Sequence, residues 1–187
     1  MSKPALENTL QEDENQLVLR SLNGDRTAYE KLYRANVGKV YALCLRMCGQ
    51  KDLAEDLTQE AFIRAWQKLD SFRGDSKFSS WLYRLTSNVV IGHMRSNKKW
   101  QFEDYDEGKH EQSLVEISQT TMMAANKKDI EKALNTLSEQ ARVVLIMHEY
   151  LGYKHTEISK ITGMAIGTSK THLHRARAQL KAQAEAA

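Results

Sequence analysis

The sequence predicts an all-α protein made of two small helical domains joined by a flexible acidic linker. Apolar residues recur at helical spacing along most of the 187 residues. The only proline is Pro4, so no proline interrupts the later helical patterns. Residues 101–128 are polar, acidic and without a period, which is typical of a linker. We therefore divide the chain into an N-terminal arm (1–11), a first domain (12–100), the linker (101–128) and a second domain (129–187).

Two helical patterns open the first domain. The first runs from Asn15 to Leu22 and ends before Gly24. Asp25 can cap the second pattern, which keeps its apolar residues on one side and ends at Gly49. We therefore expect a short helix followed by a long one.

The two cysteines lie inside the apolar stripe of the long helix. Cys44 and Cys48 are four residues apart, and a pair on one helix is a poor framework for a disulfide. We interpret them as buried free thiols in preference to a redox or metal pair.

The next pattern, Asp52 to Leu69, has two unlike faces. Asp52 can cap it, and an apolar stripe follows at Leu53, Leu57, Ala61, Ala65 and Leu69. Its other face is acidic with one apolar neighbour and consists of Asp56, Gln59, Glu60 and Ile63. A face of this composition suits docking on a protein better than binding phosphate.

A basic, aromatic helix follows a turn centred on Gly74. The 27 residues from Ser76 to Phe102 contain five Lys or Arg and neither Asp nor Glu, and six of the chain's 14 aromatic residues lie between Phe72 and Phe102. Single-stranded DNA binds to such a mixture, because cations track the phosphates and each base stacked on a ring contributes about 1–3 kcal/mol. The alternative, that Phe78 and Trp81 are core residues at helical spacing, remains open.

The residue pattern of the second domain predicts a helix-turn-helix. A stripe of helical period runs from Leu134 to Leu151 and ends at Gly152. Two short patterns, 155–162 and 167–181, then flank Gly163, and the second of them would enter the major groove. The 27 residues from 158 to 184 again hold five basic groups and no acid. A solvated face is the alternative for this basic run.

The histidines do not predict a metal site. His148 lies on the apolar stripe, so we interpret it as a packed residue. His172 and His174 point about 200° apart on a helix, with no Cys or acid nearby. The sequence also has no nucleotide-binding glycine loop, nucleophile elbow or paired carboxylates. We therefore expect no metal, no cofactor and no enzymatic activity.

Charge is distributed unevenly along the chain. Residues 1–100 carry 16 basic and 12 acidic groups, residues 101–129 carry 3 and 7, and residues 130–187 carry 8 and 5. Two basic modules thus flank an acidic segment, which suits nucleic acid as a partner. No apolar run approaches the roughly 20 residues of a membrane span, and the N-terminus is too polar for a signal peptide. We expect a cytoplasmic protein.

Three segments resemble the extracytoplasmic-function (ECF, RpoE-like) sigma factors of the bacterial sigma-70 family. They are DLTQEAFI (56–63), FRGDSKFSSWLYR (72–84) and GTSKTHLHRARAQLK (167–181). The resemblance covers roughly residues 14–181. It implies a sigma-two-like domain, a sigma-four-like domain, and a sigma factor that binds core RNA polymerase, directs it to promoters and opens the minus-ten element. It also implies an anti-sigma factor as a partner.

The resemblance assigns roles to individual residues. Contact with core polymerase is implied for Asp56, Gln59, Glu60, Phe62 and Ile63. Contact with minus-ten DNA is implied for Arg73, Asp75, Ser76, Lys77, Trp81, Arg84, Asn88, His93 and Arg95. Contact with minus-thirty-five DNA is implied for Lys170, Thr171, His174 and Arg175 at base edges and for Arg177 nearer phosphate.

Two segments have a second interpretation. By resemblance the turn with Asp75 and Ser76 reads a base rotated out of the duplex, but either residue could simply cap the next helix. In the linker, the acids at 104, 106, 107 and 111 resemble a segment that stands in for RNA inside polymerase, and a solvated tether is the alternative.

The sequence departs from the family pattern at four positions. Gly92 stands where a polar or acidic residue is common, Lys154 where a capping Ser is usual, Ala165 where Pro is frequent, and Ser169 where a core residue is apolar. Two further classes of function stay open. One is a stand-alone helix-turn-helix regulator that acts without polymerase, and the other is a helical protein that sequesters a partner.

Overall fold

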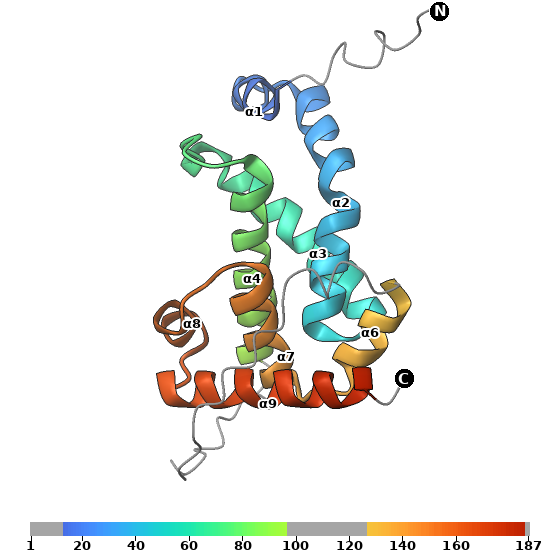
Figure 1. The fold of residues 1–187 in the computed structure, drawn as a ribbon. Helices are drawn as coiled ribbons and strands as arrows, with labels where there is room; N and C mark the ends of the chain where they lie inside the picture. The colour runs from blue at the N-terminus through green and yellow to red at the C-terminus, as the bar shows by residue number, and fades with distance from the viewer. Residues whose placement is uncertain (1–12, 97–126, 186–187) are drawn as a thin grey trace, which may run out of the picture.

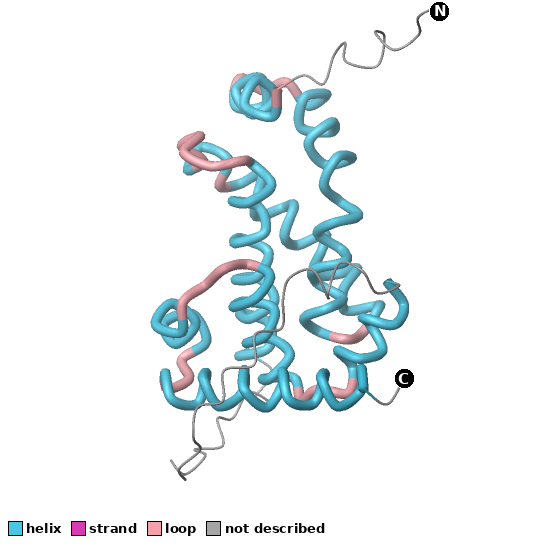
Figure 2. The backbone as a smooth tube through the Cα atoms, in the orientation of Figure 1, coloured by secondary structure: helices cyan, strands magenta, loops and turns pink. Residues whose placement is uncertain are grey.

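The computed structural model describes residues 13–96 and 127–185, and every element assigned in these two ranges is a helix (Figure 1, Figure 2). The all-α prediction is confirmed. The N-terminal arm and the four linker acids lie outside the described residues. Within the described ranges, the helices are all too short or too polar to cross a membrane.

The first domain is built from four α-helices and one short 3-10 turn. In order they are α1 (Glu14–Leu22), α2 (Arg26–Cys48), α3 (Lys51–Gln67), η1 (Leu69–Ser71) and α4 (Phe78–Ser96). Asp25 caps α2 as predicted, and its carboxylate accepts hydrogen bonds from the amides of Thr27 and Ala28 at 3.0 and 3.1 Å. Gly49 ends α2 at φ +74°, a conformation that few residues other than glycine adopt.

The predicted ends of α3 are wrong at both sides. The N-cap is Gln50 and makes no side-chain cap, while Asp52 lies inside the first turn. An acid there still interacts favourably with the positive end of the helix dipole. At the other end α3 stops at Gln67, and Leu69 is buried in the separate turn η1.

Helices α2, α3 and α4 pack on one another around the first core. Its largest fully buried side chains include Leu32, Leu43, Met47, Leu57, Phe78 and Leu82. Phe78 is therefore a core residue, whereas Trp81 is half-buried at the edge of a ring cluster with Phe72 and Phe78, at centroid distances of 5.5 to 5.7 Å. The thiols Cys44 and Cys48 are buried and free, as predicted.

The second domain contains four α-helices and one π-helical turn. They are α6 (Lys127–Asn135), α7 (Glu139–Leu145), η2 (Ile146–Tyr150), α8 (His155–Thr162) and α9 (Ile166–Glu185). The continuous stripe predicted up to Leu151 is divided, because the Ser138 hydroxyl accepts the Ala141 amide at 3.3 Å and starts a new helix.

Helices α8 and α9 form the predicted helix-turn-helix. Gly163 ends α8 at φ +83°, and the Met164 amide donates to the Thr162 hydroxyl at 3.2 Å. Helix α9 is longer than predicted. The side-chain amides of Gln179 and Gln183 donate hydrogen bonds to Thr136 Oγ1 at 3.2 and 2.7 Å, and these bonds join the end of α9 to the turn before α7.

The two domains touch along two lines. Helix α2 packs against α6 and α7, and α4 packs against α8. In Figure 1, α9 runs across the end of the molecule below α4 and α6. Helix α8 thus packs both on α4 of the first domain and on α9 of the second.

Candidate functional site

The acidic face predicted on α3 lies on the surface. Asp56 and Gln59 are exposed, and Glu60 is partly exposed and pairs with Arg64 at 2.5 Å. Ile63 follows on the same side and is 57% exposed. Positions three and four apart share one side of a helix, so these residues form one continuous face. We call them, without Arg64, the α3 face.

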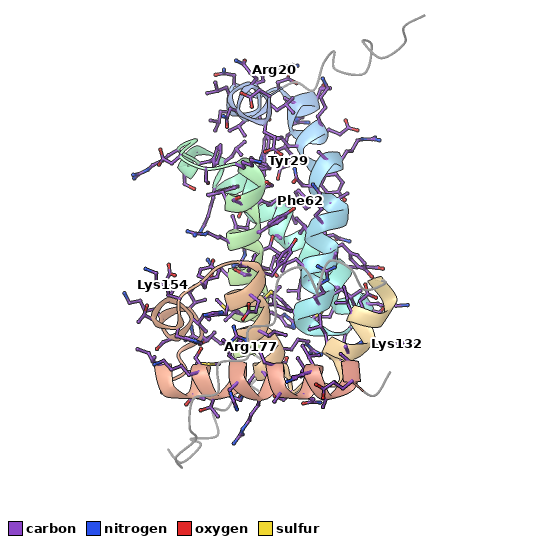
Figure 3. The ribbon with its side chains drawn as sticks, viewed as in Figure 1. Arg20, Tyr29, Phe62, Lys132, Lys154 and Arg177 are labelled. Atoms are coloured by element: carbon purple, nitrogen blue, oxygen red, sulfur yellow. The ribbon has the colours of Figure 1, made fainter. Side chains whose placement is uncertain are left out.

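Phe62 lies beneath the α3 face and not on it, and its contact with polymerase stays a prediction. Its side chain is only 5% exposed, because it follows buried Thr58 by one turn. The Phe62 ring packs edge-on against Tyr33 with ring centroids 4.6 Å apart. The main-chain carbonyl of Phe62 accepts a 2.6 Å hydrogen bond from the Tyr29 hydroxyl; both residues are labelled in Figure 3. Phe62 therefore supports the face from beneath.

Two aromatic residues extend the α3 face and were missed from the sequence. Trp66 is 42% exposed and lies three residues after Ile63, and Tyr33 of α2 is 38% exposed. Tyr29 packs edge-on against Trp66 with ring centroids 4.7 Å apart, which fixes the indole. The spacing from Ile63 could have identified Trp66, but Tyr33 comes from another helix.

The turn before α4 exposes four of the predicted minus-ten residues. Arg73, Asp75, Ser76 and Lys77 are all exposed around Gly74, which has φ +78°. The main-chain carbonyl of Lys77 accepts the amides of Ser80 and Trp81 at 3.0 and 3.2 Å and so starts the helix. Gly92, further along α4, is exposed, and a Cβ there would meet open space.

Five predicted residues share one face of α4, at steps of four, three, four and seven: Lys77, Trp81, Arg84, Asn88 and Arg95. His93 follows Asn88 by five residues, which is about 140° further round the helix. It is partly buried and lies apart from this face. We call the five residues the α4 face.

The second domain contacts the α4 face. The Arg84 guanidinium lies over the Tyr153 ring, 5.5 Å from its centroid, and Arg95 Nη1 donates to the Ile161 carbonyl at 3.3 Å. Between them, the hydroxyls of Ser87 and Tyr153 are 3.5 Å apart. Two cations of the α4 face are therefore engaged by α8 and the loop before it.

Helix α9 exposes most of the predicted minus-thirty-five residues. Lys170, His174 and Arg175 are exposed, and Thr171 is partly exposed. The Thr171 hydroxyl donates to the Gly167 carbonyl at 3.1 Å, which orients the side chain. These four residues lie at the N-terminal half of α9, where a recognition helix contacts base edges.

Arg177 is paired within the second domain, and its predicted phosphate contact stays a prediction. Its guanidinium forms an ion pair with Glu149 of η2, with Nε 3.0 Å from the carboxylate. The side chain is 20% exposed. Arg177, labelled in Figure 3, thus joins α9 to η2.

The polar replacement at Ser169 has a partner that the sequence did not reveal. Buried Ser169 Oγ lies 2.9 Å from His155 Nδ1, and the His155 ring stacks on His148 at 4.7 Å. Burial lowers the pKa of His155, and the charge of nearby His148 acts in the same direction. The neutral imidazole satisfies the serine, so a polar side chain is accommodated between α8 and α9.

The histidines at 172 and 174 point in different directions. His172 is buried, which lowers its pKa, whereas His174 is exposed. Among the described residues, no group of three or more His, Cys, Asp or Glu side chains is arranged to hold a metal ion.

Comparisons with known proteins agree with this arrangement. Residues 32–100 match the family model of sigma-70 region 2, and residues 127–180 match that of sigma-70 region 4. The ECF RNA polymerase sigma factor SigW of Bacillus subtilis is 33% identical over 170 residues, 86% of this chain and 90% of that protein. The ECF RNA polymerase sigma-E factor of Escherichia coli K12 is 32% identical over 173 residues, with coverage of 86% and 88%.

A solved structure has the same fold. It is the sigma factor RpoE in complex with the anti-sigma factor NepR from Bartonella quintana, with a TM-score of 0.53, 28% identity, and coverage of 84% of this chain and 96% of that chain. Both halves of the chain thus match successive regions of one family. The chain belongs to the ECF sigma factors of the sigma-70 family.

Proposed function

We propose that this protein binds core RNA polymerase, directs it to specific promoters and opens the minus-ten element to initiate transcription. The observation that carries the proposal is the presence of both sigma-70 regions in one chain, each with an exposed face of suitable chemistry. The domain boundaries that we propose are 12–100 and 129–187, with the linker between them. In this role the protein contacts the polymerase and the promoter DNA, and the polymerase carries out RNA synthesis.

The α3 face is the proposed polymerase site. Asp56 and Glu60 supply charge, while Ile63 and Trp66 supply apolar surface beside it. Protein interfaces gain most of their affinity from a few aromatic and aliphatic anchors surrounded by polar groups. The exposed indole of Trp66, braced by Tyr29, fits such an anchor.

The turn at Arg73–Lys77 and the α4 face are the proposed minus-ten site. Lys77, Arg84 and Arg95 would follow the phosphates of the melted strand, and half-buried Trp81 offers a ring for stacking. The exposed turn carries the polar groups that could read a rotated base.

Helix α9 is the proposed minus-thirty-five reader. Lys170, His174 and Arg175 would reach base edges in the major groove, where one good bidentate contact discriminates by about 1–3 kcal/mol. Once one domain is bound to its promoter element, the chain between the domains keeps the other domain close to its own element. Neither domain therefore has to bind DNA tightly alone. An anti-sigma factor is a further proposed partner, since the similar sigma factor RpoE has been solved in complex with one.

Run-off transcription tests the proposal. Core bacterial polymerase and a promoter library are combined with the wild-type protein, with Asp56→Ala/Glu60→Ala, or with the charge-matched control Asp70→Ala/Glu185→Ala, which removes two exposed acids outside the α3 face. We expect new start sites with the wild type and control, and far fewer transcripts with the first variant.

A protein that binds duplex DNA but never programmes core polymerase would instead be a stand-alone regulator. Equal activity of the two double variants would remove the α3 face from the proposal.

A further inference from the structure

A polar contact joins the two helices of the helix-turn-helix at the start of α9. His155, the first residue of α8, has its Nδ1 atom 2.9 Å from Oγ of Ser169. Ser169 is fully buried, and its amide donates to the Ala165 carbonyl at 3.0 Å, which closes the first turn of α9. The contact between the two side chains therefore fixes this turn against the start of α8.

The other face of the His155 ring is held by η2. It stacks on the His148 ring with centroids 4.7 Å apart and an interplanar angle of 27°. His148 Nδ1 lies 3.4 Å from Glu149 Oε1, and the same oxygen accepts Arg177 Nε of α9 at 3.0 Å. The imidazole of His155 is thus packed between η2 and α9, and it contacts both elements directly.

Two of the proposed base-contacting residues directly follow this contact. Lys170 is exposed and is the next residue after Ser169. The Thr171 hydroxyl donates to the Gly167 carbonyl at 3.1 Å. Reading a base edge requires a short and well-aligned hydrogen bond, and a hydrogen bond has a preferred direction that apolar packing lacks. The bond between His155 and Ser169 therefore restricts the rotation of α9 where the proposed base contacts begin.

The surroundings of His155 favour a neutral imidazole. Burial lowers the pKa of this ring below its ordinary value of 6.5. Three side chains lower the pKa further and one acid opposes them: His148, Lys170 and Arg177, against Glu149. The charged groups that α4 brings to α8 are also cations: Arg84 over the Tyr153 ring, and Arg95 on the Ile161 carbonyl. The ring is therefore neutral near pH 7 and takes up a proton only in acid.

A proton on His155 changes what the ring can do for Ser169. A neutral imidazole has one nitrogen that accepts a hydrogen bond, whereas an imidazolium has two N–H donors and no acceptor. A buried serine hydroxyl that loses its acceptor can turn to the carbonyl four residues earlier, which bends the helix. In α9 that carbonyl belongs to Ala165, in the first turn.

We propose that His155 is a positioning residue for the minus-thirty-five reader. Its neutral Nδ1 accepts the Ser169 hydroxyl and so sets the rotation of α9 on α8, which places Lys170 and Thr171 for contact with base edges. Protonation of His155 removes this bond, so recognition of duplex DNA weakens in acid. The proposal deepens the proposed function and rests on it for the identity of the duplex. His155 acts through Ser169 and needs no contact with DNA.

Histidine ring signals in the nuclear magnetic resonance spectrum of the full chain test the bond without DNA or polymerase. Ser169→Ala should raise the pKa of His155, because the neutral ring loses the hydroxyl that favours it. Thr156→Ala is the control. It removes an exposed hydroxyl from the next position of α8, and the pKa of His155 should then match that in the wild type.

Duplex binding tests the consequence for recognition. Duplexes are selected from a random library by the full chain, with and without core polymerase, and affinity is then measured at about pH 7.5 and about pH 6.0. His155→Ala should weaken binding about two- to tenfold at the higher pH, the effect of one lost hydrogen bond. His155→Asn should bind like the wild type at that pH, because its side-chain oxygen accepts the hydroxyl and does not titrate.

The two pH values separate positioning from a structural role. The wild type should lose more affinity in acid than His155→Asn does. His172 and His174 are present in both proteins, so their own protonation affects both alike. Equal pH dependence in the two proteins overturns the proposal, and so does an unchanged pKa of His155 in Ser169→Ala. If His155→Ala does not fold, these two comparisons still decide.

Failure of the proposed function has a different signature. A chain that selects a duplex but never programmes polymerase refutes the proposed function alone, because the comparison of the wild type with His155→Asn can still be made on that duplex. A chain that selects no duplex, with or without polymerase, overturns the role of His155 together with the reading role of α9.

Discussion

The Tyr29 hydroxyl donates a 2.6 Å hydrogen bond to the Phe62 carbonyl and so joins α2 to α3 directly behind the α3 face. The two residues are 33 positions apart, and the bond is partly buried. A surface that recognises a partner binds best when its backbone is already fixed in the bound form. This bond supplies part of that rigidity.

Tyr29→Phe should destabilise the first domain by about 0.5–1.5 kcal/mol, because it removes one partly buried hydrogen bond between α2 and α3. Chemical denaturation of the wild type and variant measures the difference. Tyr41→Phe, on the same helix, is the control with a similar chemical change. Equal losses of unfolding free energy in the two variants would show that the 2.6 Å bond contributes nothing to stability beyond an ordinary tyrosine hydroxyl.

Stability should fall between about pH 10 and pH 12. Burial raises the pKa of Tyr29 to about 12 and that of Tyr83 to about 12, whereas an unfolded tyrosine ionises near 10. The stability that these neutral phenols contribute is complete below pH 10 and is lost as the pH rises through about 12. Denaturation midpoints measured across this range should fall less steeply in Tyr29→Phe than in the wild type.

Neighbouring residues on α3 should respond in opposite ways to truncation. Ile63→Ala should weaken binding to core polymerase about tenfold with little change in stability, because the side chain is exposed. Phe62→Ala should cost about 3–5 kcal/mol of folding free energy, because its ring is buried. Thermal melts together with a polymerase binding assay separate the two effects. Loss of stability in Ile63→Ala would contradict the assignment of that face.

Arg177→Gln should destabilise the second domain by about 1–3 kcal/mol, since it removes the guanidinium that pairs with the largely buried Glu149 carboxylate. Glu149→Gln should behave similarly, and the double variant should lose less than the sum. The salt dependence of DNA binding provides a second test. Its slope should fall by about one for a phosphate contact. We expect no such fall in Arg177→Gln.

The two thiols should resist modification in the folded protein. Burial raises the pKa of Cys44 to about 12 and also raises that of Cys48, so little thiolate exists near neutral pH. A thiol reagent should count no reactive cysteine in the native chain and two after denaturation. Rapid reaction of either thiol in the native protein would show that the core opens locally at the end of α2.

Much of the fold could be predicted from interactions between residues that are close in the sequence. Asp25 and Gly49 delimit α2 correctly because capping and positive φ involve only nearby residues. The sequence does not reveal a contact in which a distant partner decides the direction of a side chain. Arg177 lies in a basic run, yet its partner Glu149 is 28 residues away and on another element.

The candidate site was predicted in outline. Composition identified the faces of α3, α4 and α9, because exposed charge follows helical period. The burial of Phe62 and the recruitment of Tyr33 depend on how α2 crosses α3, which a single helix does not encode. The contact of Arg142 with the end of α2 left no signal in the sequence, because Arg142 donates to the main-chain carbonyls of Met47 and Cys48, and every residue has such a carbonyl.

A contact built from guanidinium groups on neutral carbonyls and rings should respond weakly to ionic strength. Binding to nucleic acid releases counterions, so its affinity falls steeply as salt rises. Arg142 donates to the carbonyls of Met47 and Cys48, and Arg46 lies over the ring of Tyr150, so the contact between the two domains releases no comparable number of counterions. Concentrated salt should therefore weaken binding to nucleic acid and leave the contact between the two domains largely unchanged.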